Sequence, residues 1–323
     1  MTGVPTQPGE TRLGRGGAPF RSRRLGLSGT GRVNRVVRGR DFLSTRDLTP
    51  EELHRLLDGA AELKARARAG DHPTPLRGKV LALVFEKPSL RTRTTFETGM
   101  FQLGGAAVYL GPHDIQMGSR ETPADVARNL ERWVDGIAAR VFAHATVEAL
   151  AAHARIPVIN GLSDWEHPCQ ALAALLTVRE RFGRIAGIRL VWVGDGNNTI
   201  RSLVYAGTKL GMTIVVATPE EYGLDADTVR RGRAMAAAAN GALLITDDPI
   251  AAVREADVIY TDVWTSMGQE AAAAVRRRVF HPYQVNAALL ARAPGHAVVT
   301  HCLPAHRGEE ITDDVLDGPR SVA

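Results

Sequence analysis

The amino-acid sequence predicts an α/β protein built from two parallel-sheet domains that a long helix joins. Its 323 residues are too many for one small core and suit one large or two medium α/β domains. Short apolar runs alternate with segments of helical periodicity along the chain, which is typical of βαβ units. The apolar share of 44% and the charged share of 23% are ordinary for a soluble globular protein.

The first expected domain covers residues 41–175. Its opening helix begins after Thr49, a good N-cap, with Pro50 in the first turn. Apolar runs predict strands at residues 79–85, 106–110, 136–142 and 157–160. Helical periodicity predicts helices from about residue 92, at residues 122–134 and at residues 168–182.

The second expected domain covers residues 176–323, with the boundary along the 168–182 helix. Its strands are expected at residues 188–193, 214–217, 242–245, 257–260 and 297–300. Helices are expected between these strands, one of them at residues 199–210. The alternation predicts a second parallel sheet.

The net charge of +5 is concentrated in residues 1–40, where nine arginines and one glutamate give +8, so residues 41–323 carry −3. This Gly/Arg/Pro-rich tail is expected to stay disordered. It has three open interpretations: a transit peptide to the mitochondrial matrix, a nonspecific binder of acidic partners, or upstream sequence without a role. The mildly acidic body argues against nucleic acid as a partner.

Two further observations bear on the compartment. The longest apolar runs, such as residues 80–85, are far too short to cross a bilayer, so no membrane partner is expected. The two cysteines, Cys169 and Cys302, are too few for a disulfide framework and favour a reducing compartment. We therefore expect a cytoplasmic protein.

The first chemical motif is residues 85–94, Phe-Glu-Lys-Pro-Ser-Leu-Arg-Thr-Arg-Thr, between a strand and a helix start. Unpaired amides at a helix N-terminus attract anions. Ser89 and Thr92 add hydroxyl donors, and Arg91 adds a planar fork that suits phosphate. The motif predicts a phosphate cradle, with an ordinary helix cap beside surface arginines as the alternative.

The second motif is His167-Pro168-Cys169-Gln170. Pro168 suits the first helical position, which makes His167 the cap, and Gln170 follows three residues later, so both side chains can face one point. The histidine can donate to a carbonyl oxygen and the glutamine can read an amide. A cap around a core cysteine is the alternative. Neither this motif nor residues 301–306 has zinc-site spacing, so no metal is expected.

Polar segments follow three predicted strands of the second domain, at residues 194–198, 262–270 and 301–310. The first lacks the third glycine of a dinucleotide fingerprint, so no nicotinamide cofactor is expected. Strand ends nevertheless mark the crevice where α/β sheets bind ligands. Asp262 is placed to pair with a cation, and Gly268 suits a mobile loop. Plain surface loops are the alternative.

Taken in order, five segments resemble the aspartate/ornithine carbamoyltransferase family. They are Ser-x-Arg-Thr-Arg at 89–93, His-Pro-Cys-Gln at 167–170, Asp-Gly-Asn-Asn at 195–198, Asp-x-Trp-x-Ser-Met-Gly-Gln at 262–269 and His-Cys-Leu-Pro-Ala-His-Arg-Gly-Glu-Glu at 301–310. The first two are shared with the aspartate branch, and the last two are specific to the ornithine branch. The resemblance implies transfer of the carbamoyl group of carbamoyl phosphate to the δ-amine of L-ornithine, giving L-citrulline and phosphate.

The resemblance also implies a carbamoyl-phosphate-binding first domain. Its expected phosphate contacts are Ser89, the backbone at Leu90, where the family often has Thr, Arg91 and Thr92. Its expected carbamoyl contacts are Arg140, His167, Gln170 and Gln116, together with Cys302 and Leu303. Arg140 would bridge phosphate and carbamoyl oxygen, His167 would donate to that oxygen, and Gln170 would hold the carbamoyl amine.

By the same resemblance the second domain binds ornithine. Asn198 and the backbone near Met267 would contact the carboxylate, and Asp262 and Ser266 would contact the α-amino group. Cys302 and the Leu303 carbonyl would face the reacting δ-amine, which makes Arg140, His167 and Cys302 the expected catalytic residues.

The family implies no cofactor, carbamoyl phosphate binding before ornithine, closure of the 266–268 loop, and a homotrimer or a multiple of one. It continues beyond the residues matching 318–322 into a last helix with another arginine, whereas this sequence stops at Ala323. Two alternatives follow: a C-terminally truncated, non-catalytic paralogue, or a carbamoyltransferase for a different amine.

Overall fold

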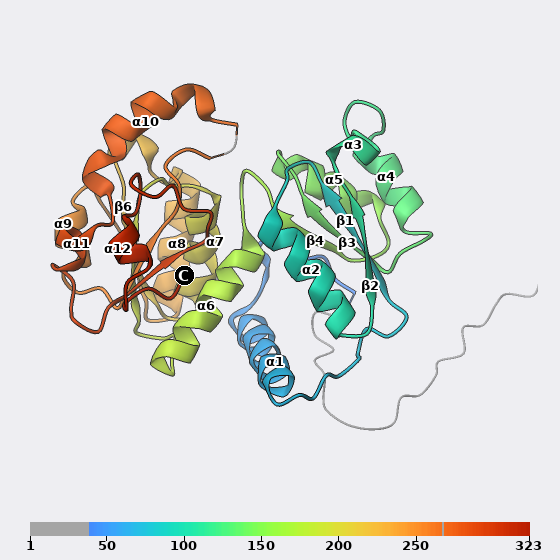
Figure 1. Ribbon diagram of the computed structural model, residues 1–323, viewed down its shortest axis with the longest axis horizontal. Coiled ribbons are helices and arrows are strands. Elements are labelled where there is room, and N and C mark those ends of the chain that lie inside the picture. The colour runs from blue at the N-terminus through green and yellow to red at the C-terminus, as the bar shows by residue number, and fades with distance from the viewer. Residues whose placement is uncertain (1–38, 267) are drawn as a thin grey trace, which may run out of the picture. The chain divides into compact units, whose positions relative to one another are not determined.

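The computed structural model describes residues 39–266 and 268–323 (Figure 1). Residues 1–38 of the predicted basic tail therefore lie outside the described residues. The described chain forms two parallel sheets with helices between the strands, which confirms the predicted fold class. In these two ranges no helix combines the length and the apolar character that a membrane crossing requires.

The first sheet has four parallel strands in the order β2-β1-β3-β4. The strands are β1 (Val80–Phe85), β2 (Ala106–Leu110), β3 (Gly136–Arg140) and β4 (Val158–Leu162). Successive side chains of a strand point to opposite faces. Leu81 and Leu83 accordingly pack into one apolar cluster, and Ala82 and Val84 into another. Burial of both faces explains why β1 is a continuous apolar run.

Three helices of this part were predicted and begin no more than two residues from their predicted starts: α1 (Pro50–Arg68), α2 (Leu90–Gln102) and α4 (Pro123–Leu130). Three further helices were not predicted: η1 (Thr45–Asp47), α3 (Pro112–Ile115) and α5 (His144–His153). At the start of α1, Thr49 and Glu52 form a capping box. The helix predicted at residues 122–134 ends earlier, because the chain after Leu130 makes turns.

The second sheet has five parallel strands in the order β7-β6-β5-β8-β9. The strands are β5 (Arg189–Val193), β6 (Thr213–Ala217), β7 (Ala242–Thr246), β8 (Val258–Thr261) and β9 (Val298–His301). The accompanying helices are α7 (Asn198–Lys209), η2 (Glu220–Tyr222), α8 (Ala226–Ala238), α9 (Pro249–Val253), η3 (Glu270–Ala272), α10 (Ala273–Phe280), η4 (His281–Tyr283), α11 (Ala287–Leu290) and α12 (Asp313–Leu316).

Helix α6 (Pro168–Phe182) connects the two sheets in sequence (Figure 1). Its N-cap is His167, Pro168 is its first residue, and its C-cap is Gly183, whose φ of 72° suits a glycine. Leu175 of α6 packs in the same apolar cluster as Trp192 of β5. The helix thus holds its first turn, the His-Pro-Cys-Gln motif, against the core of the second sheet.

Candidate active site

The predicted phosphate cradle lies where β1 leads into α2. Ser89 is the N-cap of α2, and its hydroxyl accepts a hydrogen bond from the Thr92 amide at 3.2 Å. Arg140, the last residue of β3, donates through Nη1 to the Thr92 hydroxyl at 3.3 Å. The charge of Arg91 lowers the pKa of Arg140, after the larger effect of burial. Two arginines and a helix N-terminus therefore converge, an arrangement suited to an anion.

Three further residues of the first domain, Leu90, Arg93 and Gln116, are placed as follows. Leu90 is 76% exposed at the start of α2, so only its backbone is placed for the cradle. Arg93 pairs with Glu97 at 3.1 Å, and its guanidinium lies 3.7 Å from the centre of the Tyr109 ring, so it is directed away. Gln116 is exposed at the end of α3, and no hydrogen bond within the described residues joins its side chain to Arg140.

His167 is held through its backbone at the N-cap of α6. Its amide donates to the Ser202 hydroxyl at 2.9 Å. Desolvation lowers the pKa of His167 to about 3, and the charge of Arg140 contributes to that shift, so the imidazole is neutral. His167 Nδ1 and Arg140 Nε are both buried, and neither has a hydrogen-bond partner among the described residues. Buried polar atoms usually have partners, so a polar ligand is expected here.

The rest of the His-Pro-Cys-Gln motif divides between site and core. Gln170 donates through Nε2 to the hydroxyl of Tyr260 on β8, at 3.0 Å. The Cys169 thiol lies 3.6 Å from the Asn160 carbonyl oxygen, and burial raises its pKa to about 12. Cys169 therefore contacts β4 of the first sheet, while Gln170 points to the second sheet.

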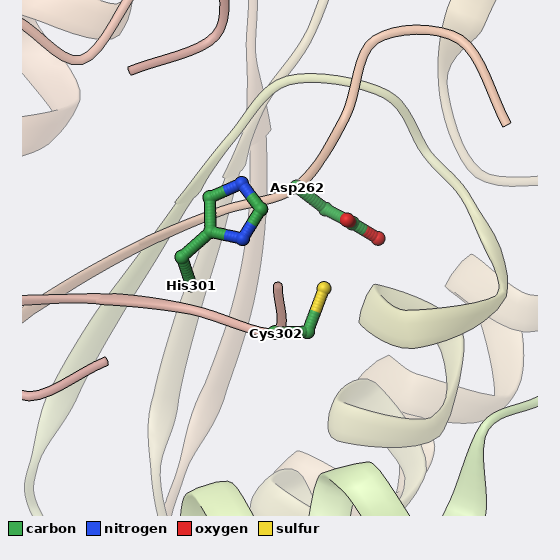
Figure 2. Close-up of side chains that lie close together, drawn as sticks. All are labelled: Asp262, His301 and Cys302. Carbon is green, nitrogen blue, oxygen red and sulfur yellow. The ribbon is translucent and has the colours of Figure 1, made fainter. Parts of the chain in front are cut away.

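The predicted amine side of the site lies at the ends of β8 and β9. Asp262 follows β8 and accepts hydrogen bonds from Asn197 Nδ2 at 2.8 Å and Thr199 Oγ1 at 3.3 Å. Cys302 follows β9 beside Asp262 (Figure 2). Burial, and then the charge of Asp262, raise the pKa of the Cys302 thiol. Cys302 therefore keeps its proton and can donate a hydrogen bond to the carboxylate.

The remaining predicted ornithine contacts are placed as follows. Asn198, the first residue of α7, donates to the Ser163 carbonyl at 2.6 Å. Ser266 lies in the loop after β8, and its amide donates to the side chain of Gln269 at 3.1 Å. Leu303 follows Cys302 with a positive φ of 55°, which turns the chain sharply at the strand end. Met267 lies outside the described residues.

Asp262, His301 and Cys302 also raise the question of a metal, because one potential ligand atom from each lies within 4.8 Å of the others (Figure 2). Both ring nitrogens of His301 are already engaged. Nε2 lies 3.0 Å from Glu310 Oε1, and Nδ1 accepts the Leu303 amide at 2.8 Å. A metal bound to His301 would have to displace one of these hydrogen bonds. The arrangement therefore suits a pair of the Cys302 thiol and the Asp262 carboxylate better than a cation site.

Sequence reasoning did not identify two residues that hold the site. Ser202 lies in the middle of α7 and supports the His167 amide, and Tyr260 lies within β8 and supports Gln170. Neither belongs to a recognisable motif. The only signal was a polar atom inside a segment predicted to be buried, which requires a partner.

Parallel sheets, an arginine-lined anion site and an adjoining carboxylate–thiol site define a phosphate-handling α/β protein. The model of the aspartate/ornithine carbamoyltransferase carbamoyl-phosphate binding domain matches residues 40–180. The model of the Asp/Orn binding domain of the same family matches residues 186–323. The chain therefore belongs to the aspartate/ornithine carbamoyltransferase family.

Similar proteins include an ornithine carbamoyltransferase of Thermococcus kodakarensis, 54% identical over 284 residues, which are 88% of this chain and 90% of that protein. Among solved structures, the Pyrococcus furiosus ornithine carbamoyltransferase has a TM-score of 0.87 at 52% identity, covering 89% of this chain and 92% of that one. The ornithine carbamoyltransferase of Thermus thermophilus has a TM-score of 0.78 at 49% identity, covering 88% and 92%.

Proposed function

We propose that this protein transfers the carbamoyl group of carbamoyl phosphate to the δ-amine of L-ornithine, giving L-citrulline and phosphate. The observation that carries the proposal is a contact between the two halves of the site. Gln170, at the start of α6, donates to the hydroxyl of Tyr260 on β8 at 3.0 Å, two residues before Asp262. The anion site and the amine site are therefore neighbours. The names of the similar proteins support the ornithine branch.

The donor is bound by residues 41–175. Its phosphate is held by Ser89, the Leu90 backbone, Arg91 and Thr92. Arg140 lies between this cradle and His167, so it bridges the phosphate and the carbamoyl oxygen. The neutral His167 donates a hydrogen bond to the same oxygen, Gln170 holds the carbamoyl amine, and Gln116 completes the site after its loop moves.

The acceptor is bound by residues 176–323. Asn198 and the backbone at Met267 hold the ornithine carboxylate, and Asp262 and Ser266 hold the α-amino group. Cys302 and the Leu303 carbonyl, which also adjoin bound carbamoyl phosphate, face the δ-amine. Asn198 Nδ2 donates one N–H to the Ser163 carbonyl, and its second N–H can donate to the carboxylate. The 266–268 loop then closes over the bound substrates.

The chemistry requires a neutral amine. The δ-ammonium first loses a proton, which desolvation beside Cys302 favours. Its nitrogen then forms a bond to the carbamoyl carbon, and the electron pair of the C=O bond moves to oxygen. Arg140 and His167 stabilise this oxyanion. The electron pair on that oxygen then re-forms the C=O bond as the carbon–oxygen bond to phosphate breaks. The nitrogen gives its second proton to the departing phosphate, whose remaining charge is held by Arg91. No covalent enzyme intermediate is needed.

The same proposal places the protein in arginine metabolism in the cytoplasm, as a homotrimer or a multiple of one. Family membership supports this assembly and setting. Size-exclusion chromatography with light scattering measures the assembly directly, and a monomer would contradict it.

The test is an assay of purified protein with carbamoyl phosphate and one of three amines: L-ornithine, L-aspartate or putrescine. We expect citrulline from ornithine and no product from the other two. Carbamoylation of aspartate or putrescine in place of ornithine would overturn the substrate assignment. Arg91→Met should abolish turnover by removing the phosphate fork. Arg93→Met is the matched control, because Arg93 is already occupied by Glu97 and Tyr109.

A further inference from the structure

Tyr260 connects the second sheet to the first turn of α6. Its side chain is fully buried on β8, and its ring lies 5.1 Å from the Trp192 ring, centre to centre. Its hydroxyl accepts the hydrogen bond from Gln170 Nε2 at 3.0 Å. A buried tyrosine needs a partner for its hydroxyl, and here that partner is a side chain of the candidate site.

We infer that Tyr260 is a positioning residue that fixes which end of the Gln170 amide faces carbamoyl phosphate. A primary amide has a donor end and an acceptor end of nearly the same shape. Because the NH2 group of Gln170 is bound to Tyr260, its carbonyl oxygen is left as the end for a ligand. The inference rests on the proposed function, in which Gln170 holds the carbamoyl amine.

The carbamoyl amine carries N–H donors, so it requires an acceptor. A Gln170 amide turned the other way would present its own donors and leave both sets of N–H groups without partners. Sites built to hydrogen-bond an N–H group strongly reject analogues that lack it. Tyr260 therefore supports discrimination between a carbamoyl group and an acetyl group, which has a methyl in place of the amine.

The experiment compares two stable phosphonates by calorimetric titration of the intact protein. Phosphonoacetamide carries the amine, and acetonylphosphonate carries a methyl group instead. Tyr260→Phe keeps the ring that packs on Trp192 and removes only the hydroxyl. Tyr205→Phe is the matched control, because Tyr205 is equally buried and its hydroxyl lies 3.0 Å from Thr228 Oγ1 in α8.

For Tyr260→Phe we expect phosphonoacetamide to bind about three- to tenfold more weakly, with acetonylphosphonate unchanged. Tyr205→Phe should leave both affinities unchanged. Equal weakening of the two ligands, or no weakening of either, would overturn the role of Tyr260. If the wild-type protein forms citrulline, the proposed function stands even where the role of Tyr260 is overturned. Wild-type protein that neither forms citrulline nor binds either phosphonate would overturn both proposals.

Discussion

Glu166 provides the clearest stability test, because a fully buried carboxylate here has only hydrogen-bond donors around it. It accepts hydrogen bonds from the Ser44 hydroxyl, from the Thr45 amide at 3.0 Å and from the Ser202 hydroxyl at 2.9 Å. Ser202 in turn accepts the His167 amide. The carboxylate therefore ties the 44–47 segment and α7 to the start of α6.

The size of the effect follows from these bonds. Glu166→Ala leaves three buried donors without an acceptor, at roughly 1–3 kcal/mol each, so we expect a loss of about 3–9 kcal/mol. Glu166→Gln keeps one carbonyl oxygen for the Thr45 amide and the Ser202 hydroxyl. Its NH2 group can donate to Ser44 once that hydroxyl rotates. The expected loss for Gln is only about 1–2 kcal/mol.

Hydrogen exchange of the peptide that covers residues 44–48 measures this effect locally. A loss of about 3 kcal/mol corresponds to roughly a hundredfold faster exchange, and Glu166→Gln should lie between Glu166→Ala and wild type. Glu180→Gln is the control, since Glu180 forms only an exposed pair with Lys64. The 44–48 peptide could exchange equally fast in Glu166→Ala and Glu166→Gln, or no faster in Glu166→Ala than in the control. Either result would show that the hydrogen bonds of Glu166 do not hold this segment.

The charged and thiol groups of the site should each have a measurable signature. Arg140→Met should lower kcat/KM by about 10²–10³-fold, which steady-state kinetics would measure. It should not lower the midpoint of thermal unfolding, because burial and the charge of Arg91 already oppose the charge of Arg140, and thermal melts would check this. His167, with its pKa lowered to about 3, should stay neutral in ¹⁵N spectra from pH 8 to pH 5. Because His167 has a pKa of about 6.5 in the unfolded chain, its contribution to the free energy of unfolding is fully present above that pH. The free energy of unfolding falls as the pH falls, and this contribution is lower by about 2 kcal/mol at pH 5. Cys169, with its pKa raised to about 12, should react with iodoacetamide at pH 8 at least about a hundredfold more slowly than in the unfolded chain, as peptide mass spectrometry would show.

The sheets were predictable from sequence because a strand buried on both faces is a short, continuous apolar run. Strand β5, which is largely buried, begins one residue later than predicted, and the ends of the other strands lie no more than two residues from their predicted positions. The edge strands β2 and β7 were predicted equally well although they are more exposed: Val108 of β2 is 46% exposed and Leu244 of β7 is 44% exposed. Apolar pattern alone does not distinguish a central strand from an edge strand.

The candidate site was predictable only where local geometry determines it. Ser89 and His167 cap helices as their motifs indicate, since capping depends on a few adjacent residues. The partners of Gln170 and Glu166 could not be predicted, because Tyr260 and Ser44 lie 90 and 122 residues away in the sequence. Packing of α6 on the second sheet brings Gln170 to Tyr260, whereas pairing of Phe42 with β4 brings Ser44 to Glu166.

Electrostatics also explain why this site should prefer ornithine to aspartate. The donor half carries the positive charges of Arg91 and Arg140, while Asp262 places a negative charge in the acceptor half and Cys302 stays a neutral thiol. An ornithine α-ammonium can pair with Asp262. The second carboxylate of aspartate would instead meet the like charge of the buried Asp262, and repulsion of this kind rejects a wrong substrate. Asp262→Asn should therefore weaken ornithine binding and reduce the rejection of aspartate. An unchanged ratio of kcat/KM for the two amines would show that the selection lies elsewhere, in the loop around Ser266.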